Sequence, residues 1–229
     1  MTAVLLDFYG TLAVAERPGN WFESILTSRG HELDPDINDR WSIVAWDGAT
    51  HHEHSLDEAT YQAWEDRRWR RLLTDHGIPV AEQDDLVAEL RHWRDGFAMV
   101  AYAETAAVLR ALADAGHRLV VCSNWDWDLD EHLEATGLAE LIHDRVSSAW
   151  VGSRKPHPLI YEKALALGGA APDDTVFVGD TWDADVEGPR RLGLTAVHVH
   201  RPEDRRPPAE LPDDVHRITD LSALVALLR

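Results

Sequence analysis

The sequence predicts an α/β protein: a doubly wound, Rossmann-like parallel sheet with an α-helical cap inserted after the first strand. Two observations predict this fold. Residues 3–6 and 175–178 are short, uninterrupted apolar runs, which are typical of strands buried on both faces of a parallel sheet. After about residue 100, segments with helical spacing alternate with strand-like segments, as they do in doubly wound folds.

The insert follows the first strand. Residues 16–97 contain no strand-like apolar run and predict an all-helical segment. Within it, Ser55 and Glu58 form a capping box that predicts the start of a helix ending near Gly77. Apolar residues spaced by three and four predict another helix over 86–97. We therefore expect an α/β core of residues 1–15 and 98–229 and a helical cap of residues 16–97.

The remaining elements alternate along the second part of the chain. Helices are expected at 104–115, 129–136, 158–167 and 221–228, with a further helix ending near Gly193, and strands are expected at 118–122, 145–148, 175–178 and 196–199. Residues 201–212 are rich in proline and charge, which predicts a surface loop.

Composition limits the class of protein. The 229 residues carry 22 basic and 41 acidic side chains, a net charge of −19, and a surface this acidic repels nucleic acid. No run approaches the roughly 20 apolar residues of a membrane span, and the first ten residues lack the basic segment of a secretory signal. The single cysteine, Cys122, excludes an internal disulfide. We expect a cytoplasmic protein, monomeric or homodimeric, that binds a small molecule.

Polar side chains stand where four strands or strand-associated loops end. They are Asp7, Ser123 with Asn124, Lys155 in the segment 152–155, and Asp180 after Gly179. In open α/β sheets, ligands bind beyond the carboxyl ends of the strands, so these residues are expected to converge.

Each of these residues has a chemical use and an ordinary structural one. Asp7 on a rigid strand end suits a nucleophile, although alone it would be a solvated turn acid. Ser123 can bond an anionic group or cap a helix. Lys155 is one of two lysines in the chain and sits before a proline. Asp180 and Asp185 near Asp7 would offer the hard oxygens that Mg²⁺ prefers, or would merely complement a helix dipole. Because all of these residues occur together, we favour their chemical use over the ordinary structural one.

The residues resemble the haloacid dehalogenase superfamily of hydrolases, motif by motif and in the same order. The four segments are Asp7-Phe8-Tyr9-Gly10-Thr11-Leu12, Cys122-Ser123-Asn124, Arg154-Lys155-Pro156-His157-Pro158, and Gly179-Asp180-Thr181-Trp182-Asp183-Ala184-Asp185. The resemblance runs from about residue 2 to 200, and a helical insert between the first two motifs is the family's cap arrangement.

The resemblance implies roles for these positions. Asp7 would attack and form a covalent aspartyl intermediate, and Ser123 and Lys155 would hold and neutralise the transferred group. Mg²⁺ would be bound by Asp7, Asp180 and the backbone carbonyl of Tyr9, with Asp185 supporting the metal or orienting Lys155. Expected substrate contacts come from Thr11, Asn124 and Trp125.

Tyr9 departs from the phosphatase pattern, which has a second aspartate at this place as general acid. Three outcomes follow: Tyr9 donates the proton itself, the substrate has an acidic leaving group, or the reaction is not phosphoryl transfer. The 2-haloacid dehalogenases of the superfamily carry tyrosine here, need no metal, and have neutral residues in place of Gly179-Asp180. A halide-binding arginine is not recognisable in residues 20–45, where Arg40 is a weak candidate.

Because the fourth motif keeps its acids, we expect a Mg²⁺-dependent hydrolase that acts on a small organic phosphate through Asp7. The alternative is a metal-independent 2-haloacid dehalogenase in which Asp7 attacks carbon. A second alternative is a non-catalytic domain that binds a ligand or partner, which the presence of Asp7, Ser123, Lys155 and Asp180 disfavours.

Two further groups of residues bear on the site. The chain has ten tryptophans: Trp125, Trp127 and Trp182 lie just after the second and fourth motifs, and Trp41 and Trp46 are among those in the insert. They would line an aromatic pocket or, as we favour, pack cap against core. His51, His52 and His54 would form a second metal site, supply a missing acid, or, as we favour, lie in a solvated loop.

Overall fold

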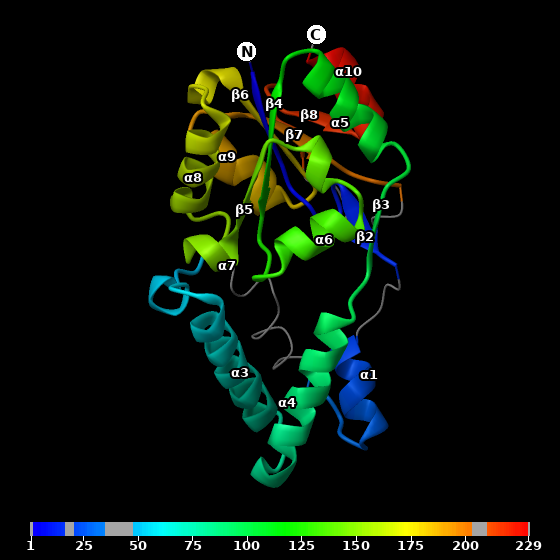
Figure 1. Ribbon diagram of the computed structural model, residues 1–229, viewed down its shortest axis with the longest axis vertical. Helices are drawn as coiled ribbons and strands as arrows, with labels where there is room; N and C mark the ends of the chain where they lie inside the picture. The colour runs from blue at the N-terminus through cyan, green and yellow to red at the C-terminus, as the bar shows by residue number, and fades with distance from the viewer. Residues whose placement is uncertain (1, 17–20, 35–47, 203–209, 229) are drawn as a thin grey trace.

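The computed structural model describes residues 2–16, 21–34, 48–202 and 210–228. Its main feature is a parallel sheet in the strand order β5-β4-β1-β6-β7-β8, which confirms the predicted doubly wound fold (Figure 1). The strands are β1 (Ala3–Leu6), β4 (Arg118–Ser123), β5 (Asp144–Ser147), β6 (Thr175–Gly179), β7 (Thr195–Val199) and β8 (His216–Ile218). β1 lies at the centre, between β4 and β6, where both of its faces are covered.

Helices cover the two faces of the sheet. On one side lie α5 (Thr105–Asp114), α6 (Leu129–Ala135) and α10 (Leu224–Leu227), and on the other lie α8 (Pro158–Gly168) and α9 (Gly188–Arg190) (Figure 1). Within β1, Val4 and Leu6 pack into the cluster that holds α5, whereas Leu5 packs into the cluster that holds α8. Because successive side chains of a strand point to opposite faces, a strand buried on both faces must be apolar throughout.

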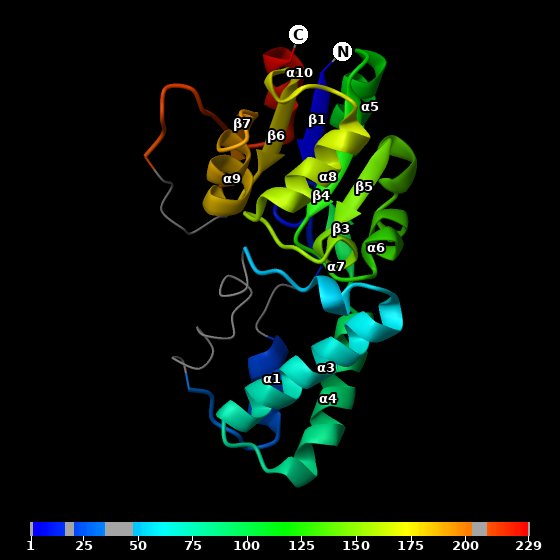
Figure 2. The ribbon, with the colours of Figure 1, turned by 90° about the vertical axis from the view of Figure 1, so that its left-hand side faces the viewer.

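Among the residues that the structure describes, three α-helices lie between β2 (Ala13–Ala15) and β3 (Met99–Ala101): α1 (Trp21–Ser28), α3 (Glu58–Asp75) and α4 (Val80–Asp95). They enclose an apolar cluster of their own, which includes Leu26, Leu73 and Leu90. In Figure 2 this group lies beyond the end of the sheet toward which β1 and β6 point. The helices therefore stand opposite the carboxyl edge of the sheet.

Several expectations need correction. β2 and β3 form a two-stranded antiparallel ribbon at the base of the insert that was not predicted, because each strand has only three residues. β8 was also missed, and its central Arg217 breaks the apolar run. The helix expected to be capped by Ser55 begins at Glu58, and its N-cap is Asp57, whose Oδ1 accepts from the Thr60 backbone N–H at 2.7 Å.

The prediction of a surface loop at 201–212 is wrong for its first residue, which is buried. Arg201 is 6 % exposed, and residues 203–209 lie outside the described part of the chain. The last helix, expected at 221–228, consists of a 3-10 turn, Leu221–Ala223, followed by α10. Among the described helices, none combines the length and the apolar character that crossing a lipid bilayer requires.

Candidate functional site

Asp7 directly follows β1 and is buried. Its Oδ1 accepts hydrogen bonds from Ser123 Oγ at 2.9 Å and from Lys155 Nζ at 2.7 Å. Parallel pairing of β1 with β4 sets Leu6 opposite Val121, so the two strands end at the same edge and bring Ser123 to Asp7. The structure thus brings together the three residues that the sequence placed at separate strand ends.

Lys155 is held from two directions. Its side chain is 2 % exposed and its Nζ also donates to Asp185 Oδ1 at 2.6 Å. Its backbone is clasped by the Asn124 side chain, which accepts from the Lys155 N–H at 2.6 Å and donates to the Lys155 carbonyl at 3.0 Å. Burial alone would lower the pKa of Lys155, but the carboxylates of Asp185 and Asp7 raise it well above its ordinary value. The residue is therefore a fixed cation.

Asp185 lies in a turn of π-helix, Trp182–Glu187, and is completely buried. Its Oδ1 contacts Lys155, and its Oδ2 accepts from the Thr181 backbone N–H at 2.9 Å. Burial raises the pKa of Asp185 above its ordinary value; Lys155 opposes this rise, and the carboxylate of Asp7 adds to it. Both oxygens are occupied by protein donors, an arrangement that suits the orienting of Lys155.

Three carboxylates gather at this edge: Asp7, Asp180 and Asp185 each offer an oxygen within 4.8 Å of the others. Gly10 fits against them, because a Cβ at Gly10 would lie 2.7 Å from the Asp180 carboxylate, and its φ of +77° is in the left-handed region that favours glycine. Two of them, Asp7 and Asp185, share the ammonium of Lys155. The hard oxygen donors of the three carboxylates fit a divalent cation such as Mg²⁺.

Tyr9 is the exposed member of the first motif, with 44 % of its surface accessible. Its ring stacks loosely on Trp125, with 6.5 Å between ring centroids. Trp125 also contacts Phe8 edge-on at 5.0 Å, and its Nε1 donates to Asp128. An aromatic surface therefore lies two residues from Asp7, and the predicted contact residue Trp125 forms part of it.

The other two predicted substrate contacts are placed differently. Thr11 is completely buried, and within the described residues its hydroxyl has no hydrogen-bond partner. The side-chain amide of Asn124 is engaged by the backbone of Lys155. Neither side chain offers an unoccupied, exposed polar group, so a contact from Asn124 to a substrate would use its backbone.

The histidine cluster does not form a solvated loop throughout. His51 is buried, its ring stacks on Trp64 at 4.8 Å, and its Nδ1 lies 3.0 Å from Ser55 Oγ. His54 stacks on the same Trp64 at 5.2 Å, and His52 Nδ1 donates to the Val151 carbonyl. In the described part of the chain, the one metal-suited group of side chains is the aspartate group, so the histidines do not form a second metal site.

The tryptophans near the site make packing contacts. Trp127 lies 5.9 Å from the Tyr61 ring, and Trp182 meets the His198 ring edge-on at 5.3 Å. Arg40, Trp41 and Trp46 lie outside the described residues.

His198 was missed by the sequence analysis. It lies in β7 opposite Gly179, is 3 % exposed, and its Nε2 donates to the Asp180 carbonyl at 3.2 Å. The Arg217 Nε donates to the Nδ1 atom at 3.0 Å, which fixes the proton on Nε2. A histidine within the apolar run 196–199 was the available signal, since a polar residue in a buried strand needs partners.

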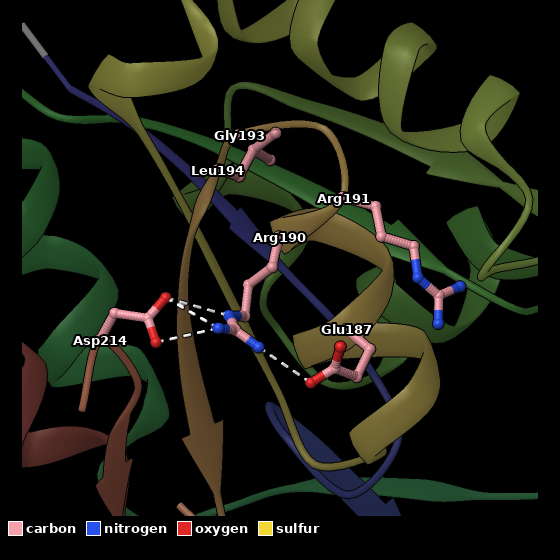
Figure 3. A pocket seen from close by; sticks show the side chains of 6 residues that line it. All are labelled: Glu187, Arg190, Arg191, Gly193, Leu194 and Asp214. Atoms are coloured by element: carbon pink, nitrogen blue, oxygen red, sulfur yellow. Dashed lines mark hydrogen bonds and ion pairs between the residues drawn. The ribbon is translucent and has the colours of Figure 1, made fainter. Parts of the chain in front are cut away.

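A surface hollow of about 400 Å³ is lined by other residues (Figure 3). It is lined by Glu187, Arg190, Arg191, Gly193, Leu194 and Asp214. Arg190 donates to both Asp214 oxygens and to Glu187, so the charges of this triad are mutually satisfied. The hollow is wide open to solvent and includes none of the predicted site residues.

A doubly wound sheet with a buried acid and lysine at its carboxyl edge places the protein among Rossmann-type α/β proteins. A model of the haloacid dehalogenase-like hydrolase family matches residues 1–193, and the chain belongs to this family. The superfamily resemblance drawn from the sequence is thereby confirmed.

Curated relatives of more than one activity are similar to this chain. It is 33% identical over 124 residues to haloacid dehalogenase-like hydrolase domain-containing protein 3 of Bos taurus, covering 53% of this chain and 49% of that protein. It is 37% identical over 116 residues to a phosphoserine phosphatase of Thermus thermophilus (49% and 45%). It is 30% identical over 130 residues to (S)-2-haloacid dehalogenase 4A of Burkholderia cepacia (56% and 55%). The matched part spans about half the length of these relatives.

Solved structures share the fold. A HAD phosphatase from Thermococcus onnurineus is 24% identical, with a TM-score of 0.59 and coverage of 100% of this chain and 98% of that one. An L-2-haloacid dehalogenase from Xanthobacter autotrophicus with chloropropionic acid covalently bound is 19% identical, with a TM-score of 0.63 and the same coverage. At these identities the likeness concerns the fold alone.

Proposed function

We propose that the protein is a Mg²⁺-dependent phosphatase that hydrolyses a small organic phosphate through an aspartyl-phosphate at Asp7. The observation that carries this proposal is the group of three carboxylates, Asp7, Asp180 and Asp185, around the single ammonium of Lys155. Three clustered carboxylates offer the hard oxygen donors that Mg²⁺ prefers, which supports a metal-dependent phosphatase over a dehalogenase that works without a metal.

The proposed reaction uses the side chains as they lie. Both described hydrogen bonds to Asp7 fall on Oδ1, so Oδ2 is the oxygen that we propose attacks phosphorus. The bond from phosphorus to the ester oxygen breaks, and the leaving group takes a proton from Tyr9 or leaves unprotonated if it is acidic. Water then attacks the aspartyl-phosphate, which releases phosphate and restores Asp7. Ser123 and Lys155 hold and neutralise the phosphoryl oxygens throughout.

Mg²⁺ would be held by Asp7, Asp180 and the Tyr9 carbonyl, and when bound it would neutralise charge on the phosphoryl group. Asp185 would hold the ammonium of Lys155 in place and would thereby keep Lys155 oriented toward Asp7. We assign Trp125 to the wall that faces the substrate and the backbone of Asn124 to the phosphate, and Thr11 to support of the turn rather than to direct contact.

The helical segment is proposed as the cap that covers this site. Its loop 48–52 runs beside the segment 152–155: the Gly48 N–H donates to the Lys155 carbonyl at 3.0 Å, and the His51 N–H donates to the Gly152 carbonyl at 2.7 Å. Tyr61 of α3 donates to Asp126 Oδ1 at 2.8 Å, in the loop that follows Ser123. The segment therefore contacts both loops that carry the site. The division into core and cap, the cytoplasmic location, and the monomeric or dimeric state stay predictions.

One observation favours the dehalogenase as a second candidate. Tyr9 occupies the place of the expected general acid, and the relatives include a haloacid dehalogenase. In that reaction Asp7 would attack carbon, displace halide and form an ester that water hydrolyses, without a metal.

Product release distinguishes the two functions. Phosphate release from aryl, acyl and sugar phosphates is measured with Mg²⁺ and with a chelator, and halide release from 2-chloropropionate is measured in parallel. Asp7→Asn, which keeps the shape of the side chain, is the matched control. Phosphate release that needs both Mg²⁺ and Asp7 supports the phosphatase; halide release that persists with chelator and is lost in Asp7→Asn overturns it.

A further inference from the structure

Arg201 is a buried arginine that reaches the turn following Asp7. It lies two residues after β7 and is 6 % exposed. Its Nη2 donates to the Thr11 carbonyl at 2.7 Å and its Nε donates to the Gly10 carbonyl at 3.2 Å. The guanidinium therefore bonds two consecutive carbonyls that lie 191 and 190 residues earlier in the chain.

The remaining contacts of Arg201 fix its own position. Its Nη1 donates to Glu104 Oε1 at 2.9 Å, and its guanidinium carbon lies 3.3 Å from the centre of the Tyr102 ring. Both partners stand just before α5. An arginine held by a carboxylate and an aromatic face loses little further freedom in binding carbonyls, so its grip on the turn is rigid.

The turn that Arg201 holds, at Gly10 and Thr11, lies against the carboxylate group. Gly10 has φ +77° and lies against the Asp180 carboxylate, so a small shift of this residue would change the space beside Asp180. The peptide between Tyr9 and Gly10 determines where the Tyr9 carbonyl points, and Arg201 holds the two peptides that follow. Buried carbonyls that lose their donor seek another one, which would let the turn rotate.

We propose that Arg201 is a positioning residue for the divalent cation: by holding the Gly10 and Thr11 carbonyls, it keeps the Tyr9 carbonyl and Asp180 in one cation-binding arrangement. This inference rests on the proposed function, since it takes the carboxylate group as a Mg²⁺ site. Outer partners of metal ligands typically change metal affinity by about 10- to 100-fold when they are removed.

Arg118 provides a matched control. Its Nε donates to the Leu167 carbonyl at 2.7 Å and its Nη2 donates to Asp144 at 3.0 Å, so it also joins a carbonyl to a carboxylate. It begins β4, whereas Ser123 ends that strand, so Arg118 lies at the opposite end of the sheet from the site. Arg118→Gln therefore removes the same kinds of contact at a place remote from the carboxylate group.

The test measures Mg²⁺ binding to the metal-free protein by titration calorimetry, for wild type, Arg201→Gln, Arg201→Lys and Arg118→Gln. We expect Arg201→Gln to weaken Mg²⁺ binding by at least about 10-fold. The Mg²⁺ affinity of Arg201→Lys should lie between those of wild type and Arg201→Gln, because a lysine can still donate to the Thr11 carbonyl. Arg118→Gln should bind Mg²⁺ as tightly as wild type does. The rise in melting temperature on adding Mg²⁺ should follow the same order.

The outcomes separate this inference from the proposed function. Equal Mg²⁺ affinity in wild type and Arg201→Gln would overturn the role of Arg201 and leave the phosphatase proposal standing. Absence of Mg²⁺ binding by wild type would overturn the phosphatase proposal and the inference with it. If Arg201→Gln does not fold, Arg201→Lys decides the matter, because unchanged affinity in that variant contradicts the inference.

Discussion

The ammonium of Lys155 lies 2.7 Å from Asp7 and 2.6 Å from Asp185, so that one buried cation joins an acid at the end of β1 to an acid in a π-helical turn. Asn124 holds the backbone of the same lysine. These residues are far apart in the sequence and come together only in the folded protein. Lys155 is the residue that Asp7, Asp185 and Asn124 all contact.

Replacement of Lys155 by methionine should be costly for both stability and activity. Asp7 and Asp185 would remain buried without their cation, so we expect the free energy of unfolding to fall by about 3–5 kcal/mol. Turnover should fall by about 10²–10³-fold, because the charge that neutralises the transferred group is lost. Urea denaturation and product release measure the two effects.

Lys163→Met is the control for this variant, because it removes the chain's other lysine from an exposed position in α8. It should leave both quantities near their wild-type values. A Lys155→Met protein as stable as the control would contradict the structural role of the ion pairs.

Tyr9→Asp should broaden the range of phosphates that the enzyme hydrolyses. The side chain is 44 % exposed, so the change should not disturb the core. A carboxyl group at this position would protonate poor leaving groups, a contribution worth roughly 10²–10⁴-fold in general acid catalysis. We expect hydrolysis of alkyl phosphates to rise by about 10²-fold relative to aryl phosphates, measured as the ratio of kcat/KM.

Tyr9→Phe separates the two explanations of the wild-type enzyme. If Tyr9 donates the proton, the phenylalanine variant loses activity on alkyl phosphates; if Tyr9 is not the donor and the natural leaving group is acidic, the variant keeps the wild-type activity on both alkyl and aryl phosphates. A Tyr9→Asp variant whose preference for aryl phosphates increases would argue against this view of the position.

Gly179→Ala should disturb the site by displacing the side chain of Asp185. A Cβ at Gly179 would lie 2.3 Å from the carboxyl carbon of Asp185, which is fully buried and cannot move aside without releasing Lys155. We expect a loss of about 1–3 kcal/mol in the free energy of unfolding, as in other overpacked cores, with reduced turnover.

Gly96→Ala is the matched substitution, because the atom nearest to its Cβ would be the backbone carbonyl oxygen of His92 at 3.4 Å. Thermal melts of both variants should therefore show a loss in Gly179→Ala only. Equal melting temperatures for the two would mean that the Asp185 turn is free to relax.

His51 should make the protein less stable as the pH falls. Burial, with help from Arg154 and Arg68, lowers its pKa to about 4, whereas the unfolded chain takes up a proton near pH 6.5. The folded state binds fewer protons between these values, so the free energy of unfolding should fall as the pH drops from about 6.5 to 4, by about 2 kcal/mol once screening is allowed for. Above that window His51 contributes no pH dependence.

The measurement is the slope of the free energy of unfolding against pH, for wild type and for His51→Asn. The asparagine side chain does not take up a proton between about pH 4 and 6.5. His54→Asn removes a ring that stacks on the same Trp64 and controls for lost packing. The slope should flatten in His51→Asn alone, and an unchanged slope would show that the buried imidazole is not responsible.

The fold and the convergence of the site followed from local patterns. Residues 3–6 and 175–178 are apolar on both faces, and this can be satisfied only inside a covered parallel sheet. Once such strands are parallel, their carboxyl ends share an edge, so Asp7 and Asp180 must meet there. The order of the four motifs then identified the family without any contact being known.

What the sequence could not give were the partners of individual polar side chains. The side chain of Asn124 bonds the backbone of Lys155, His51 was expected to be solvated and is buried, and Arg201 was expected in a surface loop and is also buried. Three-residue strands such as β2 carry too few side chains for a periodic signal.

The sequence by itself therefore determined the sheet, the helical insert and the edge where the chemistry lies, because apolar periodicity depends on neighbours a few residues apart. Only the tertiary structure decided which oxygen of Asp7 is bonded, how Lys155 is fixed, and that Arg201 grips the turn after Asp7. Those contacts join residues between 30 and 190 positions apart, and they form where packing forces buried polar groups to find partners.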